Sequence, residues 1–447
     1  MKKEEQSQVH VFKKAIEKYI NLMNAQMEAF PMIMNTLTAR LKANSDRMTK
    51  FMNLNHIQQD RDEEQNQVVI SVPLSLAKNF EKYNTEIKQS VSALQLTPQN
   101  LVVAFVSIYD AFLADIIEGM YKMCPQKLNS CARTYTSSDI LQFGSIDEIK
   151  DHLIEKEVES VLRESHANQF EWLKKTLNVE LTKDLPNYKH FIEITERRNL
   201  FVHTNGKISR QYMKCCKKNG ISIDNMSLGA HVKATPSYVL HCYNILFEIG
   251  IKLGQVVWRK IDSKNSLEEA DSMLMDIIYD LLKTQKYDLA INLSEFATAS
   301  YVKDYNKLHE YVKCVNKALA YYLSGNKQKC NECVNSIDWS ATEHRFKLAS
   351  KVLLEDFESA CNIMREMGAL ENLQNAFREW PLFTKFREEA LFKTTYKEIF
   401  SKDFEFMEIK PIGWEDVVKE SLSIVEEINK HKEEAVQNSN SVHKEGE

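Results

Sequence analysis

The chain is poor in the residues that make turns. Only 11 glycines and 8 prolines occur among its 447 residues, whereas glycine alone usually makes up about 7% of a protein. A sheet-rich protein needs turn residues between its strands, but helices can be joined by short polar loops. Apolar residues form 43% of the chain, enough for buried helical cores. We therefore predict an all-α protein.

The spacing of apolar residues predicts four parts. Residues 1–66 carry two amphipathic stretches separated by Pro31, which predict an N-terminal helical hairpin or arm. Residues 67–262 contain the most apolar helices and predict a helical domain. Residues 263–405 predict helical repeats, and residues 406–447 predict a C-terminal helix followed by a disordered polar tail.

Two local signals refine this division. Val68–Val72 is consistent with a short strand that Pro73 limits. Thr97 and Pro98 are typical of a helix start, with threonine as the cap and proline in the first turn. We therefore expect one helix to end near Leu94 and another to begin at this pair.

The prediction of helical repeats depends on a pattern in which a small residue follows an aromatic or turn residue. Each follows an aromatic or turn residue, as in a tetratricopeptide hairpin, where small residues let two helices touch. The small residues are Ala290, Cys330 and Ala360, at spacings of 40 and 30 residues. The pattern predicts a degenerate helical-repeat region, with an ordinary helical bundle as the alternative. Repeats of this type offer a groove for a partner protein or a peptide trigger.

Charge and cysteine content restrict the classes of function. The net charge is −5, so a nucleic acid would have to bind to a local basic patch. Nine scattered cysteines predict reduced thiols, as in the cytoplasm. Cys330 and Cys333 form a CxxC without a second pair at zinc spacing, and we expect them in the core. We predict no metal and no cofactor.

The sequence also bears on location. The first ten residues, MKKEEQSQVH, lack the apolar core of a signal peptide. The uncharged stretch from Ala234 to Phe247 is too short to span a bilayer. We expect a cytoplasmic protein that makes no membrane contact.

One predicted helix, within residues 187–206, carries a pattern with chemical meaning: NYKHFIEITERRNLFVHTNG. Arg198 falls in its apolar stripe, four residues after Ile194 and four before Val202. Burying an unpaired charge is costly, so Arg198 must meet a carboxylate, a partner chain or an anionic ligand. Arg197 is expected to point away from this stripe, into solvent.

The end of this helix combines an amide, an imidazole and a cation. Asn199 and His203 are one turn apart and share a face. Asn205 and Gly206 form a good left-handed helix end. An imidazole beside a fixed cation suits acid–base work on a phosphodiester. Arg198 and His203 lie about 140° apart around an ideal helix, so two facing copies would focus them on one phosphate more easily than one.

Residues outside this helix complete the candidate site. Asp110 interrupts the apolar run at 98–122, and either pairs with Arg198 or reaches solvent. A basic run follows the helix and is interpreted either as a track for an RNA backbone or as a solvated face. Its members are Lys207, Arg210, Lys214, Lys217 and Lys218.

Together, these features resemble the HEPN family of ribonucleases. Arg198-Asn199-Leu200-Phe201-Val202-His203 fits the family signature of arginine, a polar residue, three residues and histidine, and the resemblance covers residues 98–262. It implies a homodimer with facing motifs. It also implies that His203 transfers the proton of a ribose 2′-OH, that Arg198 stabilises charge on the phosphate, and that Asn199 orients the histidine or the phosphate. The products would be a 2′,3′-cyclic phosphate and a 5′-OH, formed without a metal.

One position departs from a subgroup of that family. Asn205 stands where HEPN proteins paired with a nucleotidyltransferase antitoxin carry a tyrosine two residues after the histidine. Regulation by modification of that tyrosine is therefore not expected.

Three hypotheses for function follow. The first is an endoribonuclease, a toxin or antiviral effector controlled by its helical repeats. The second is a non-catalytic HEPN dimer that binds RNA or a nucleotide. The third is a repeat-based interaction scaffold in which Arg198 and His203 are structural. The sequence contains no Walker loop, Rossmann fingerprint or HExxH motif.

Overall fold

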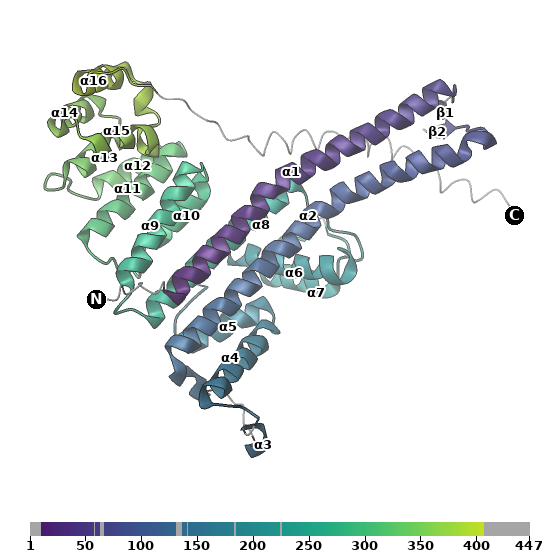
Figure 1. The fold of residues 1–447 in the computed structure, drawn as a ribbon, viewed down its shortest axis with the longest axis horizontal. Coiled ribbons are helices and arrows are strands. Elements are labelled where there is room, and N and C mark those ends of the chain that lie inside the picture. Colours follow the sequence, from purple (N-terminus) through teal and green to yellow (C-terminus); the bar gives the residue numbers. More distant parts are fainter. Residues whose placement is uncertain are drawn as a thin grey trace, which may run out of the picture. The chain divides into compact units, whose positions relative to one another are not determined.

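The computed structural model describes residues 10–57, 59–62, 67–130, 136–140, 142–182, 185–223 and 226–405. These residues form sixteen α-helices, three short 3₁₀-helices and one two-stranded β-hairpin (Figure 1). The predicted all-α class is confirmed at this level. The predicted C-terminal helix and tail, 406–447, lie outside the described residues.

Packing divides the chain into two compact units that do not follow chain order. We call one the motif unit, because it holds Tyr19–Ala111 and Pro186–Leu246. We call the other the repeat unit; its described residues lie within Met1–Lys18, Phe112–Leu185 and Phe247–Ile409. Three long helices contribute residues to both units, namely α1 (Val11–Leu54), α2 (Leu74–Met123) and α8 (Pro236–Ile261).

Helix α1 continues through Pro31. The prediction that this proline separates two helices of a hairpin within residues 1–66 is therefore wrong. A proline inside a helix removes one hydrogen bond and clashes with the preceding turn, at a cost of about 3 kcal/mol. The apolar stripe nevertheless crosses the proline without interruption, because Phe30 and Met34 are both buried. Burial of such side chains offsets the cost, at roughly 1.5–3 kcal/mol for each one.

Helix α2 continues through Pro98 in the same way, so the predicted helix start at Thr97 and Pro98 is also wrong. Leu94 before the proline and Leu101 after it are both buried. The Thr97 hydroxyl does not cap a helix start, since it donates a hydrogen bond to the carbonyl of Ala93 at 2.8 Å. Burial of apolar residues on both sides of Pro98 keeps this helix continuous.

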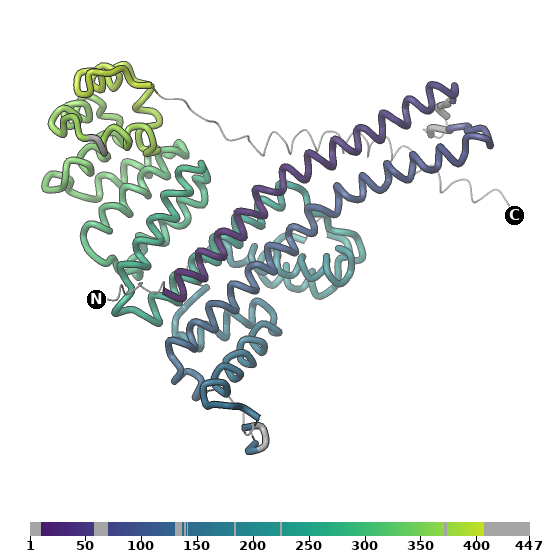
Figure 2. Tube along the Cα trace, viewed as in Figure 1, coloured from purple at the N-terminus to yellow at the C-terminus, as the bar shows by residue number. Residues whose placement is uncertain are grey.

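An antiparallel β-hairpin connects α1 and α2, formed by β1 (Gln59–Asp62) and β2 (Gln67–Ile70). The short strand predicted near Val68 is thus confirmed, with limits shifted by one or two residues. Within the motif unit, the parts of α1 and α2 next to the hairpin lie side by side and antiparallel (Figure 2). The rings of Phe51 and Tyr83 lie 5.2 Å apart across this pair.

A polar layer lies inside this helix pair. The buried Asn44 donates a hydrogen bond from Nδ2 to the hydroxyl of Ser90 at 2.9 Å. Its Oδ1 accepts a hydrogen bond from Arg47 at 2.6 Å. Polar residues in the seam of a helix pair fix its register, because any shift leaves them buried without a partner.

The core of the motif unit surrounds α6 (Tyr188–Thr204). Phe191 of α6 packs edge-on against Tyr109 of α2, with ring centroids 5.0 Å apart. Helix α7 (Arg210–Lys218) follows, and Leu200 of α6 lies in one buried cluster with Tyr212 of α7. Helix α6 is therefore covered by several elements and not on a single face.

The repeat unit contains the remaining helices. Their bounds are η1 (Pro125–Ser130), α3 (Ser137–Ile140), α4 (Ile146–Leu162), α5 (His166–Leu177), α9 (Leu267–Lys283), α10 (Tyr287–Ala297), α11 (Lys307–Leu323), α12 (Lys327–Asn335), α13 (His344–Leu353), α14 (Phe357–Met367), α15 (Glu371–Glu379), η2 (Pro381–Phe383), η3 (Phe386–Glu388) and α16 (Ala390–Phe400). Helix α11 packs against both members of the preceding pair, α9 and α10, and against α12 and α13.

Three helix pairs in this unit share one turn geometry. A left-handed residue ends the first helix of each pair, two residues before the second helix begins, and these residues are Gln285, Gly325 and Glu355. The next backbone N–H then donates to a carbonyl five residues earlier, at 2.8–2.9 Å in every case. The predicted small residue is the fourth of each second helix and is fully buried, as seen for Ala290, Cys330 and Ala360. The same turn and the same small residue thus recur three times.

A buried ion network joins α8 and α9 to α11 within this unit. The fully buried carboxylate of Asp271 accepts hydrogen bonds from Arg259 at 2.6 Å and from Lys313 at 2.7 Å. Burial alone would raise the pKa of Asp271, but the contacts with Lys313 and Arg259 outweigh burial and lower that pKa. Asp271 is therefore held as an anion.

Helix α2 also has the length and composition of a membrane span, with a mean hydropathy of 1.8 over its most apolar window. Half of that window is buried inside the protein. Core helices of proteins that do not enter membranes meet the same test, so this feature is weak evidence for a membrane span.

Candidate active site on helix α6

Arg198 and Asp110 form an ion pair between α6 and α2. The Nη2 atom of Arg198 donates to Oδ2 of Asp110 at 2.8 Å. The two side chains are 22% and 26% exposed. Of the two alternatives for Asp110, the structure shows the pairing. A pair with this exposure contributes only about 0–1 kcal/mol to stability, so its main effect is to orient the guanidinium.

The guanidinium of Arg198 retains unused donors. Its Nη1 donates to Oδ1 of Asn199 at 3.1 Å, and its Nε is buried without a hydrogen-bond partner among the described residues. A guanidinium offers five N–H groups, so these two contacts leave donors for an anion. Asn199 contacts the arginine in this structure, and in the described part of the chain no hydrogen bond joins it to His203.

His203 lies in the last turn of α6 and is exposed. The helix ends as predicted, with Asn205 in the left-handed conformation at φ 51° and the Gly206 N–H donating to the carbonyl of Leu200 at 2.9 Å. Val202 was expected in the buried stripe but is 50% exposed. Leu200 is the buried residue of this turn, because α7 packs against it. The end of α6 thus presents an imidazole beside an apolar side chain.

Arg197 is not a solvated charge, which corrects the prediction. Its side chain is 15% exposed, and its Nε donates to Oε1 of Glu193 at 2.7 Å. Glu193 also accepts hydrogen bonds from the hydroxyl of Tyr212 on α7, at 2.5 Å, and from that of Tyr238 on α8, at 2.8 Å. The guanidinium lies 4.0 Å from the ring centroid of Tyr238. The prediction failed because it assumed one covered face, whereas α7 and α8 cover another.

The tyrosines of this cluster are held in the protonated form and Arg197 in the charged form. Burial, reinforced by the Glu193 carboxylate, raises the pKa of Tyr212 far above its usual value. Burial is also the main reason for the raised pKa of Tyr238. Burial opposes the charge on Arg197, but its contacts with Tyr238 and Glu193 outweigh burial and raise its pKa further. Both tyrosines therefore stay protonated and act as donors. The spacing of Glu193 and Arg197, four residues apart on a helix, is a sequence signal for this pair.

Four of the five predicted basic residues lie on α7, and the fifth, Lys207, precedes that helix. Tyr212 and Cys216 are the buried residues of α7, so the opposite side of this helix faces solvent. All five predicted cations are exposed, and none of them forms an ion pair within the described residues: Lys207, Arg210, Lys214, Lys217 and Lys218. Unpaired, exposed cations on a short helix are available for an anionic partner.

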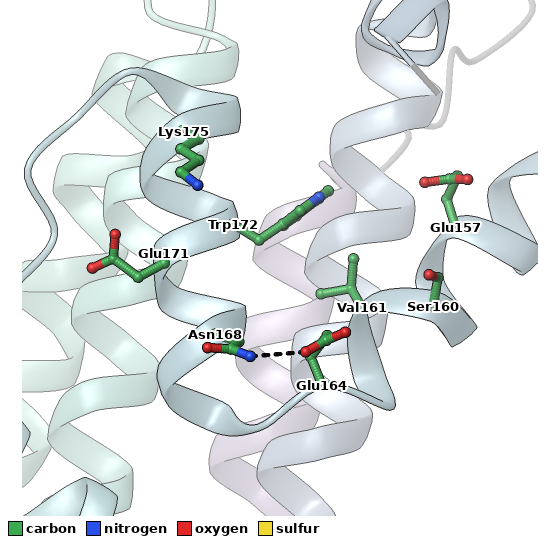
Figure 3. A pocket seen from close by; sticks show the side chains of 8 residues that line it. All are labelled: Glu157, Ser160, Val161, Glu164, Asn168, Glu171, Trp172 and Lys175. Carbon is green, nitrogen blue, oxygen red and sulfur yellow. Dashed lines mark hydrogen bonds between the residues drawn. The ribbon is translucent and has the colours of Figure 1, made fainter. Parts of the chain in front are cut away.

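An open groove lies elsewhere, between α4 and α5 of the repeat unit (Figure 3). Trp172 and Val161 form its apolar part. Within its lining, Nδ2 of Asn168 donates to Oε2 of Glu164 at 2.9 Å (Figure 3). None of the predicted site residues lines this groove.

No family model, curated protein or solved structure matches this chain. Over the described residues, no group of three or more histidine, cysteine, aspartate or glutamate side chains is placed to hold a metal ion. The predicted CxxC lies in the repeat unit, where burial raises the pKa of the Cys330 thiol to about 12. That thiol is therefore protonated and a poor nucleophile or metal ligand.

Proposed function

We propose that this protein is a metal-independent endoribonuclease of the HEPN type. It cleaves RNA to 2′,3′-cyclic phosphate and 5′-OH ends, and acts in the cytoplasm as a toxin or antiviral effector. The observation that carries the proposal is the state of Arg198. Asp110 orients its guanidinium while further Nη N–H groups remain unused, five residues before the exposed His203.

The roles of the residues follow from their chemistry. His203 transfers the proton of the ribose 2′-OH, because imidazole changes charge near neutral pH. Arg198 stabilises the charge that develops on the phosphate, and Asp110 and Asn199 hold Arg198 in place. The exposed basic face of α7 binds the RNA backbone on either side of the cleaved bond.

The active form is a homodimer through the end of α6. Arg198 and His203 point in directions about 140° apart on one helix, so a second copy supplies the complementary group. The half-exposed Val202 beside His203 offers an apolar contact for such a copy. The helix pairs of the repeat unit bind a protein or peptide trigger that controls activity.

The test is cleavage of total RNA and tRNA by the purified full chain in the presence of EDTA. Wild type is compared with His203→Ala and Arg198→Ala, and with His344→Ala, an exposed histidine of the repeat unit, as the matched control. We expect cleavage by wild type and by the control alone. The new 3′ ends should resist ligation until the cyclic phosphate is removed, and the 5′ ends should accept phosphate from a kinase.

Two other outcomes separate the alternatives. RNA binding without cleavage, in a chain whose expression does not arrest growth, would favour the non-catalytic dimer, for which the unpaired cations of α7 are the supporting observation. If neither RNA binding nor growth changes in His203→Ala and Arg198→Ala, the interaction scaffold is favoured.

A further inference from the structure

A second histidine lies at the end of α6, although it is distant in sequence. We propose that His231 is the general acid of the cleavage reaction and protonates the 5′ oxygen as it leaves. This inference rests on the proposed ribonuclease function and assigns a residue outside the R-N-x3-H motif.

One hydrogen bond of His231 determines which ring nitrogen carries a proton in the neutral imidazole. Its Nδ1 lies 3.0 Å from the backbone carbonyl oxygen of Asn205. A carbonyl can only accept a hydrogen bond, so Nδ1 carries a proton in both the neutral and the charged ring. The side chain is exposed, which leaves Nε2 as the nitrogen that can exchange a proton with a substrate. This is how a catalytic histidine is oriented by a neighbouring acceptor.

The backbone holds His231 firmly against the end of the motif helix. His231 forms an antiparallel bridge with Lys207. On either side of the bridge, Ile208 donates to the carbonyl of Ala230 at 2.8 Å, and Val232 donates to the carbonyl of Gly206 at 2.9 Å. His231 is thereby held against the carbonyl of Asn205, which follows His203 by two residues in the chain.

Gly206 permits this close approach. Its φ is +80°, and a Cβ at this position would lie 2.9 Å from the carbonyl oxygen of Val232. A side chain there would be strained and would push the 230–232 segment away from the helix. Gly206 thus allows the segment 230–232 to approach the end of α6 and to place the imidazole of His231 there.

The chemistry of RNA cleavage needs two proton transfers. A base removes the proton of the 2′-OH, the 2′ oxygen bonds to phosphorus, and the bond from phosphorus to the 5′ oxygen breaks. An acid then supplies a proton to the 5′ oxygen, so that the products are a cyclic phosphate and a 5′-OH. His203 acts as the base in this scheme, and His231 acts as the acid through Nε2–H.

A substrate with sulfur in place of the bridging 5′ oxygen tests this assignment directly. A thiolate leaves without a proton, so the reaction no longer needs the acid. We expect the His231→Ala variant to cleave ordinary RNA roughly 10²–10⁴-fold more slowly than wild type. The same variant should cleave the sulfur substrate at nearly the wild-type rate. His203→Ala should remain slow on both substrates.

A conservative variant separates chemistry from structure. His231→Asn keeps a donor toward the Asn205 carbonyl but cannot transfer a proton, so we expect it to be as slow as His231→Ala on ordinary RNA. Restored activity in His231→Asn, or an equal loss on both substrates in His231→Ala, would overturn the assignment while leaving the ribonuclease function intact. If wild type cleaves neither substrate and its expression does not arrest growth, the proposed function fails and this inference fails with it.

Discussion

Replacing Arg197 by alanine should destabilise the motif unit far more than replacing its neighbour Arg198. Removing one partner of a buried ion pair costs about 3–5 kcal/mol, because the other charge stays buried without its counter-charge. In Arg197→Ala that charge is Glu193, whose side chain is 7% exposed. The variant also loses the stacking of the guanidinium on Tyr238, which adds about 0.5–2 kcal/mol.

Arg198→Ala should cost only about 0–1 kcal/mol, because its pair with Asp110 is partly exposed. It should nevertheless abolish cleavage. Arg197→Lys is the matched variant for the buried site, since it keeps the charge but loses the planar guanidinium. We expect it to lie between wild type and Arg197→Ala in stability.

The assay is urea unfolding of the full chain, combined with amide hydrogen exchange. Exchange localises the effect, and we expect Arg197→Ala to accelerate exchange in α6, α7 and the start of α8 while leaving α11 to α14 unchanged. Equal stability losses for Arg197→Ala and Arg198→Ala, or a loss below about 1 kcal/mol for Arg197→Ala, would refute this account of the buried cluster.

Three further predictions concern other parts of the chain. Asp110→Ala should reduce cleavage by up to about a hundredfold through misplacement of Arg198, with little change in melting temperature; a large melting shift with unchanged activity per folded molecule would contradict this role. Neutralising three lysines of α7 to glutamine should weaken RNA binding at low salt and reduce the salt slope by about 0.7 for each phosphate that is no longer neutralised, and unchanged binding would mean a merely solvated face; the lysines are Lys214, Lys217 and Lys218. The lowered pKa of Asp271 should stabilise the repeat unit above the ordinary aspartate pKa of about 4, and this stabilisation should disappear as the pH falls through the lowered value. Asp271→Asn should flatten this acid dependence in urea unfolding, and an unaltered pH profile would exclude Asp271 as its source.

Local signals in the sequence were sufficient for several features. The scarcity of glycine and proline indicated helices, and the described residues are almost wholly helical. Asn205 and Gly206 indicated a helix end, and the helix ends there. Arg198 within an apolar stripe required a counter-charge, and Asp110 supplies it. Each of these features depends on a few neighbouring residues or on the cost of an unpaired charge, which holds in any fold.

Other features depended on which elements pack together. Pro31 and Pro98 indicated helix starts, but packing on both sides carries α1 and α2 through them. Arg197 was expected in solvent because the sequence does not reveal that α7 and α8 cover its side of α6.

The sequence by itself determined the helical class, the end of α6 and the need of Arg198 for a partner, which was a carboxylate, another chain or an anionic ligand. Only the tertiary structure decided the partners of Arg197 and the position of His231, which lies 26 residues from the carbonyl that orients it. The reason is physical: helix propensity and the cost of buried charge act locally, whereas the choice of a distant partner depends on how all the apolar faces pack at once.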